Sequence, residues 1–233
     1  MSASYRTLIV SVPYLVLALF LLWLPRPWLR AGVHVIPSRH RRHSAIYASN
    51  PHNLREPGDR SVWLREELVN RRNYLDLLRG SIGGWWVMNL CFSLPPANGA
   101  PPSGRLTLFA FQAGIFVVAV LIQMVRWNGR LSLFAPIFFL MGLMAGMCSW
   151  QVTLFAAVLV LTVNGVLPNP EVFLFLQAIA VVGFSAFFFR TISLRTLLGA
   201  SLILLPAIVS LLAREELVLK TKRPRPKESG HLA

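Results

Sequence analysis

The sequence predicts an all-α fold, a multi-pass helical membrane protein with about seven transmembrane helices. Hydrophobic residues make up 55% of the 233 residues and charged residues only 14%, and the mean hydropathy is +0.57. A soluble domain carries about 25% charged residues. The composition therefore excludes a soluble globular fold, a coiled coil, a disulfide scaffold and a disordered chain.

Residues 1–25 are the first predicted transmembrane helix, with an apolar run at 7–24. The alternative for such a run is a secretory signal peptide. Signal peptides carry their basic residues before the apolar stretch and a small-residue cleavage site after it. Here Arg26 and Arg30 follow the run, and no such site comes after it, so we expect a retained helix.

Residues 26–80 form a basic segment, which we expect in the cytoplasm. The segment holds eleven arginines. Within it, the stretch 61–79 is predicted to be an amphipathic helix, because four leucines recur at helical spacing on one face. Those leucines are Leu64, Leu68, Leu75 and Leu78.

The arginines of this segment favour contact with anionic lipid headgroups. Each basic residue near a membrane surface gains about 1 kcal/mol from such a contact. Nucleic acid is the other common partner of a basic segment, but the aromatic stacking pattern that accompanies it is missing. We expect membrane lipids to be contacted by Arg39, Arg41, Arg42, Arg71 and Arg72.

Residues 81–213 are predicted to form the transmembrane bundle. Its first apolar run, 82–94, is short for a span. The run crosses the membrane only if its helix begins near Leu77 and Arg79 extends to the headgroups. A re-entrant segment at 81–95 is the alternative, and it reduces the count to six spans.

The remaining predicted spans are 106–125, two helices within 131–167, 171–189 and 196–213. The apolar stretch 131–167 has 37 residues, which would make a single helix about 55 Å long, nearly twice the hydrocarbon thickness. We therefore expect a break near 148–151. If the stretch is one helix, the count again falls to six. The basic tail 214–233 follows.

Charge asymmetry predicts the orientation. Seven crossings with the N-terminus outside place 19 Lys and Arg residues in the cytoplasm and four outside. Cytoplasmic loops of membrane proteins are enriched in these residues. The count predicts a cytoplasmic C-terminus and a location in a bacterial cytoplasmic (inner) membrane. Two of the outside arginines, Arg190 and Arg195, follow the rule least well.

The predicted spans hold no ionisable residue deep in an apolar stretch. Ion coupling and intramembrane histidine ligation of haem usually need such residues. Glu171 begins a predicted helix, where it complements the helix dipole. Cys91 and Cys148 lack metal-ligand spacing and are expected to fill space in the core. The residues favour a non-enzymatic protein without metal or cofactor, although enzymatic activity stays open.

Two GxxxG motifs and several amides lie in the apolar runs. Small residues at this spacing allow helix backbones to approach closely, within the chain or with a partner. The motifs are Gly80–Gly84 and Gly142–Gly146, and Ala110 with Gly114 is a related pair. The amides are expected either to make helix–helix hydrogen bonds or to line a cavity: Asn89, Gln112, Gln123 and Gln177.

The segment 74–80, Tyr-Leu-Asp-Leu-Leu-Arg-Gly, resembles the LDxLRG stretch that precedes the first span of the large multi-pass membrane acyltransferases. The resemblance implies acyl transfer that depends on Asp76 and Arg79. Those families have more spans and a histidine in or near the early ones, whereas this chain has no histidine between residues 53 and 230. An amphipathic helix with both side chains at the membrane interface accounts for the same residues.

Three functional hypotheses follow from these features. The first is a non-enzymatic subunit or scaffold of a membrane complex, favoured by the close-packing glycines and the basic segment. The second is a transporter or flippase of a lipid or apolar small molecule, with the amides lining its path. The third is an acyl-transfer enzyme, which depends on the resemblance alone.

Overall fold

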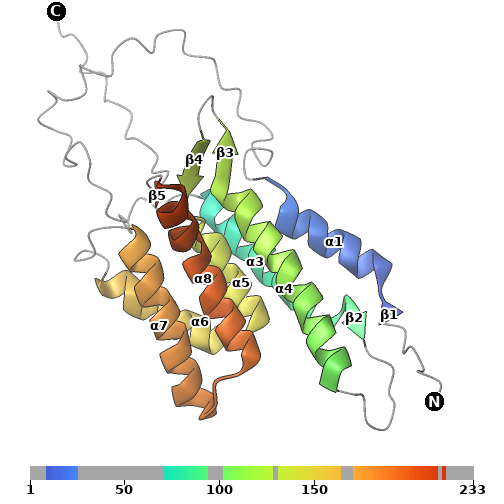
Figure 1. Cartoon of the computed structure of the whole chain (residues 1–233). Coiled ribbons are helices and arrows are strands. Elements are labelled where there is room, and N and C mark those ends of the chain that lie inside the picture. Colours follow the sequence, from blue (N-terminus) through green and yellow to red (C-terminus); the bar gives the residue numbers. More distant parts are fainter. Residues whose placement is uncertain are drawn as a thin grey trace, which may run out of the picture.

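The computed structural model describes residues 9–25, 71–93, 102–127, 131–163, 170–214 and 217–218. This part of the chain is a bundle of helices with a few very short strands (Figure 1). The helices described are α1 (Val12–Trp23), α3 (Arg71–Asn89), α4 (Pro102–Met124), α5 (Ile137–Met147), α6 (Trp150–Val163), α7 (Pro170–Phe189) and α8 (Leu194–Ala213).

Two small sheets join helix ends. Strand β1 (Ile9–Val10), which precedes α1, pairs antiparallel with β2 (Phe92–Ser93), which follows α3. Strand β4 (Leu131–Phe134) pairs antiparallel with β3 (Val125–Trp127) and parallel with β5 (Leu217–Val218). The second sheet therefore gathers the end of α4, the start of α5 and the end of α8 at one end of the bundle, here called the β3–β5 end.

Within the described ranges, three helices are long and apolar enough to cross a membrane: Gly104–Met124, Pro170–Phe189 and Leu194–Ala213. The predicted count of seven spans is not supported. Helices α1, α5 and α6 are apolar but have only 12, 11 and 14 residues. At 1.5 Å per residue they are about 17–21 Å long, whereas the hydrocarbon core is about 30 Å thick.

The stretch 131–167 is divided where a break was expected. Helix α5 ends at Met147 and α6 begins at Trp150, with Cys148 and Ser149 between them. The beginning of the stretch differs from the expectation, because 131–134 is a strand. Its backbone groups are paired in the three-stranded sheet, so the helix starts only after Pro136.

Helix α3 differs more from the expectation. One continuous helix runs from Arg71 to Asn89, across the boundary placed near residue 80 between the basic segment and the bundle. Residues 61–70 of the expected amphipathic helix lie outside the described residues. Only residues 82–89 of the apolar run at 82–94 are helical, and they form the second half of a helix whose first half carries the charged residues.

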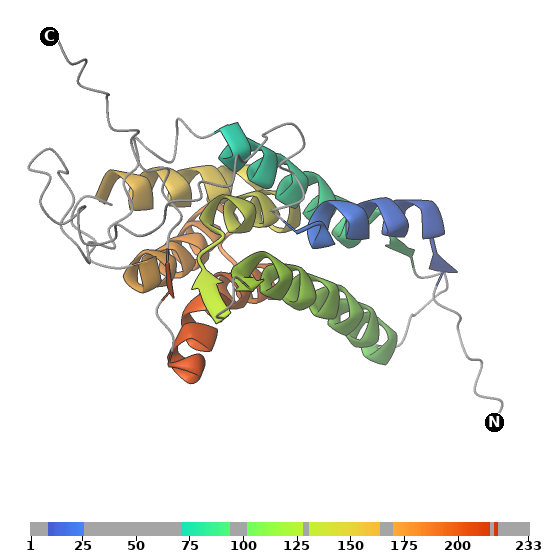
Figure 2. The same cartoon turned by 90° about the horizontal axis from the view of Figure 1, so that it is seen from above.

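Helix α3 packs most extensively against α5 and also contacts α1. Seen from above, α4 and α8 lie on the other side of α5 (Figure 2). Almost every side chain of α5 is buried. A helix that is apolar on all sides needs such a position, because it has no polar face to turn outward.

Glycines set the distance between α3 and α5. A methyl group added at Gly80 would lie 2.6 Å from the carbonyl oxygen of Phe139, and one at Gly84 would lie 3.1 Å from the Leu143 side chain. From the other side, methyl groups at Gly142 and Gly146 would collide with the backbone of α3. The structure therefore brings the two GxxxG motifs face to face.

Two further glycines at helix contacts were not singled out from the sequence. A methyl group at Gly83 would lie 2.7 Å from Cγ of Leu22, so this glycine allows α1 to pack closely against α3. One at Gly199 would lie 2.5 Å from the sulfur of Met144, where α8 meets α5. Neither belongs to a GxxxG pair, which explains why spacing alone missed them.

Replacing Gly142 by alanine is expected to lower the free energy of unfolding by about 1–3 kcal/mol, the usual effect of overpacking. The added methyl group would meet the Leu77 backbone, which has no room to move away. Gly183→Ala is the matched control, because no atom of the described chain lies within 4 Å of a methyl group at that position of α7. Chemical unfolding in mixed detergent micelles measures both variants, and equal stability of the two would contradict this packing.

Candidate functional site

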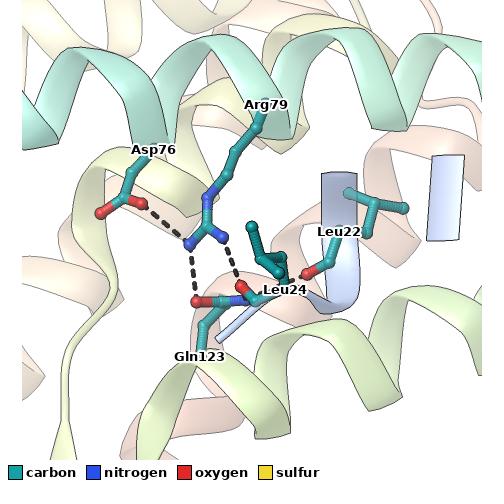
Figure 3. Close-up of polar contacts among 5 residues, drawn as sticks. All are labelled: Leu22, Leu24, Asp76, Arg79 and Gln123. Carbon is teal, nitrogen blue, oxygen red and sulfur yellow. Dashed lines mark hydrogen bonds and ion pairs between the residues drawn. The ribbon is translucent and has the colours of Figure 1, made fainter. Parts of the chain in front are cut away.

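Figure 3 shows a cluster of polar side chains in the bundle. The cluster lies near the β3–β5 end, because Gln123 lies just before the end of α4 and the start of β3. Asp76 and Arg79 come from α3 and Gln123 comes from the last turn of α4. Their residues are 3%, 6% and 3% exposed. Buried charges are rare unless they are paired and hydrogen-bonded, so the cluster is the first place to look for chemistry.

The guanidinium of Arg79 is the centre of this cluster. Its Nη2 atom lies 2.8 Å from Oδ1 of Asp76 and donates a 2.6 Å hydrogen bond to Oε1 of Gln123. Its Nη1 atom donates to the carbonyl oxygen of Leu24 at 2.5 Å. The guanidinium carbon also lies 5.2 Å from the centre of the Phe139 ring, a cation–π distance.

These bonds complete the C-terminus of α1. The last carbonyl groups of a helix have no partner within the helix, and Pro25 prevents α1 from continuing. Gln123 Nε2 donates to the carbonyl oxygens of Leu22 and Leu24, both at 3.0 Å, while Arg79 reaches Leu24 as well. The negative end of the α1 dipole also favours a cation at this position.

The expectation that Arg79 extends to the lipid headgroups is therefore wrong. Its partners lie inside the bundle, on α1, α3 and α4. The spacing of Asp76 and Arg79 could have indicated this, because an i, i+3 pair shares a helix face. Buried Gly80 and Gly83 belong to the same side of α3, so a charged pair beside small residues was the available signal.

The arrangement of the cluster supports a structural role. Each bond described for Arg79 and Gln123 goes to a protein group that needs it, and together they join α1, α3 and α4. All five histidines lie outside the described residues. Within the described ranges, no group of three potential metal ligands occurs. The geometry gives no separate support to acyl transfer at Asp76 and Arg79.

The other predicted amides do not meet in one place. Asn89 is exposed and donates to Trp85 O of its own helix at 2.9 Å. Gln112 is buried and donates to Val87 O on α3, also at 2.9 Å. Gln177 is buried on α7, where both of its side-chain polar atoms lack a hydrogen-bond partner among the described residues. No common polar path forms among the three.

The expected lipid-contacting arginines are described only in part. Arg71 is exposed and Arg72 is half-buried, both in the first turn of α3. Arg39, Arg41 and Arg42 lie outside the described residues. Lipid contact by all five therefore stays a prediction.

The cysteines lie apart from this cluster. Cys91 is buried after the end of α3. Cys148, in the turn between α5 and α6, donates its thiol to the Arg195 carbonyl oxygen at 3.5 Å. Burial raises the pKa of the Cys148 thiol to about 11, so the reactive thiolate is scarce at neutral pH.

An apolar groove of about 480 Å³ runs along the outer face of α4. Successive turns of α4 form its floor, and the indole of Trp23 on α1 closes one side, donating to the Ile115 carbonyl at 3.2 Å. No described residue lies within 4 Å of a methyl group placed at Gly114. The lining of this α4 groove is Trp23, Thr107, Ala110, Phe111, Gly114, Ile115 and Val118.

Replacing Arg79 by methionine is expected to lower the free energy of unfolding by about 3–5 kcal/mol, because buried Asp76 loses its ion pair with Arg79. Adding Asp76→Leu should restore part of the loss, since no charge then remains in the cluster. Arg71→Met, an exposed change on the same helix, should stay within about 0.5 kcal/mol. Chemical unfolding compares the three, and an Arg79→Met protein as stable as Arg71→Met would refute the structural role.

The comparisons with known proteins give no further guide to this site. No family model, no curated protein and no solved structure matches the chain. The function is therefore inferred from the arrangement of the bundle and its surface.

Proposed function

We propose that the protein is a multi-pass subunit of a membrane complex, without enzymatic activity of its own, that binds a transmembrane helix of its partner in the α4 groove. The observation that carries this proposal is the open space over Gly114. In a membrane, small residues on a helix face let a second backbone approach closely.

The three small-residue motifs divide into two kinds. Gly80–Gly84 and Gly142–Gly146 pack on each other inside the bundle. Ala110 and Gly114 have the same spacing but line the open groove. Since the inner motifs are already occupied by the chain itself, a partner helix has only the α4 motif available among these three.

The depth of the groove also favours a membrane partner. Its α4 residues lie between 107 and 118, in the middle of the apolar stretch Gly104–Met124. A helix that crosses the bilayer would place this stretch in the hydrocarbon core. The occupant we infer is therefore an apolar helix with small residues of its own, rather than a soluble peptide.

The proposed orientation places the β3–β5 end in the cytoplasm, in a bacterial inner membrane. The segments that join the described bundle at that end include 26–70, 128–130 and the tail beyond 218. Most of the arginines and lysines of the chain lie in them, and the positive-inside rule assigns such segments to the cytoplasm. Arg105, Arg190 and Arg195 then lie on the outer side.

A lipid carrier is the second candidate, because the same groove is apolar and open along one side. An acyl chain is the cargo that such a lining favours. The predicted amides weigh against a polar path, since the α4 groove is lined by none of them.

Labelling of single cysteines tests the orientation. In a chain without Cys91 and Cys148, we introduce Thr191→Cys or Ala213→Cys, both exposed positions at opposite ends of α8. A membrane-impermeant maleimide should label residue 191 in intact cells and residue 213 only after permeabilisation. The reverse pattern would invert the orientation, and labelling of both in intact cells would show that α8 does not cross.

Replacing Gly114 by leucine tests the partner site. The side chain would fill the α4 groove, and we expect about a tenfold loss of co-purifying partner, which corresponds to ~1.4 kcal/mol of binding. The unfolding free energy should not fall, because the position faces open space. Gly183→Leu is the control, an equally open position on α7, outside the groove.

Native mass spectrometry of the gently extracted protein gives the readout. Stoichiometric partner proteins that are lost only in Gly114→Leu support the subunit. A lone chain that retains one lipid in wild type, but not in Gly114→Leu, supports the carrier instead. A lone chain with nothing bound refutes both.

A further inference from the structure

The turn between α7 and α8 carries two arginines beside a cluster of phenylalanines. Arg190 and Arg195 are both exposed, and no acidic residue occurs anywhere from 172 to 214. Figure 1 shows this turn at the end of the bundle away from the β3–β5 end. The local charge is therefore positive, with no carboxylate on either helix of the hairpin to offset it except Glu171 at the far end of α7.

The phenylalanines form one contiguous patch over α6 and α7. The ring centre of Phe155 lies 5.2 Å from that of Phe188 and 5.8 Å from that of Phe184, and Phe187 lies 5.3 Å from Phe188. Phe187 is 75% exposed and Phe155 is 48% exposed. Exposed apolar patches next to charged residues mark surfaces that meet another molecule or a membrane.

The backbone of Arg190 has a conformation that favours glycine. Its φ angle is 55°, in the left-handed region. Glycine adopts this conformation without strain and is the usual residue where a helix ends in this way. Arg190 adopts it with a long side chain, as Arg214 does after α8, so the backbone at Arg190 is consistent with a functional guanidinium but does not require one.

The neighbouring backbone is held firmly in place. Ser193 caps α8 by accepting a 3.1 Å hydrogen bond from the Thr196 N–H, and the Thr196 hydroxyl lies 3.0 Å from that of buried Ser185 on α7. The carbonyl oxygen of Arg195 accepts a hydrogen bond from the thiol of Cys148, which follows the last residue of α5. The main chain around Arg195 is thus fixed from two sides while its side chain is exposed.

We propose that the α7–α8 turn binds an anionic phospholipid, with Arg190 and Arg195 facing the phosphate headgroup and the phenylalanine patch facing the acyl chains. The chemistry fits because guanidinium groups bind phosphate oxygens with charge-assisted hydrogen bonds. The site lies at the other end of the bundle from Arg71 and Arg72, the lipid contacts expected from the sequence. It rests on the membrane location proposed above.

Competition between two lipids tests the site. The purified full-length protein is incubated in mixed micelles that contain equal amounts of phosphatidylglycerol and phosphatidylcholine, and native mass spectrometry counts each retained lipid. Wild type should retain more phosphatidylglycerol. In Arg190→Gln/Arg195→Gln the preference should fall about fivefold for each arginine removed, as expected for basic residues at a membrane surface.

Two further variants separate lipid binding from folding and from general charge. Arg105→Gln removes an exposed arginine from the start of α4 and should keep the wild-type preference. Arg190→Gly should lower the preference while the unfolding temperature stays equal or rises, because glycine relieves the left-handed backbone. A merely structural Arg190 would instead lower the unfolding temperature.

Each contrary result has a distinct meaning. Equal retention of the two lipids by wild type, an unchanged preference in the double variant, or an equal loss in Arg105→Gln would overturn the site. Flotation of the protein with phosphatidylglycerol vesicles checks the membrane location separately. A protein that stays at the bottom of the gradient refutes that location, and a protein that floats without lipid preference refutes the site alone.

Discussion

A buried guanidinium is tolerated only where counter-ion and acceptors surround it, and Arg79 obtains them from three helices. Asp76 on α3, Gln123 on α4 and the Leu24 carbonyl at the end of α1 all lie within bonding distance. Since no single helix satisfies the cation, α1, α3 and α4 have to meet at the β3–β5 end. The short α1 can end there because its last carbonyls find donors.

The second constraint is the close approach of α3 and α5. Side chains larger than hydrogen would not fit at Gly80 or Gly142, so the two backbones lie nearly in contact. This approach buries α5, and its neighbours cover it on several sides. A partner therefore has access to the outer helices and not to the buried α5.

The surfaces left open are of two chemical kinds. The α4 groove is apolar, and Ala110 and Gly114 are among the residues that line it. It lies at the depth of the hydrocarbon core, where a helix or an acyl chain is the expected occupant. The α7–α8 turn combines arginines with exposed phenylalanines, which suits a boundary between water and hydrocarbon. The buried cluster of Asp76, Arg79 and Gln123 contributes to neither surface directly, but it holds α4 and α1 in the positions that form the groove.

Composition and periodicity by themselves determined that the chain is helical and that several helices are apolar enough for a membrane. The length of the 37-residue apolar stretch 131–167 also predicted its break, because a single helix of that length would be longer than the hydrocarbon core is thick. Such conclusions need only length and hydropathy, which are local properties. For the same reason the glycine motifs could be found in the sequence but their partners could not.

Only the tertiary structure decided which of those features face inward. Arg79 next to an apolar run looks the same in sequence whether it meets lipid headgroups or the end of α1. Its burial depends on Gln123 and Leu24, 44 and 55 residues away. In the same way, Gly142 and Gly114 are alike in sequence, yet α3 occupies the space over Gly142, whereas none of the described helices occupies the space over Gly114. Contacts between distant segments are set by packing in three dimensions, which the local pattern does not encode.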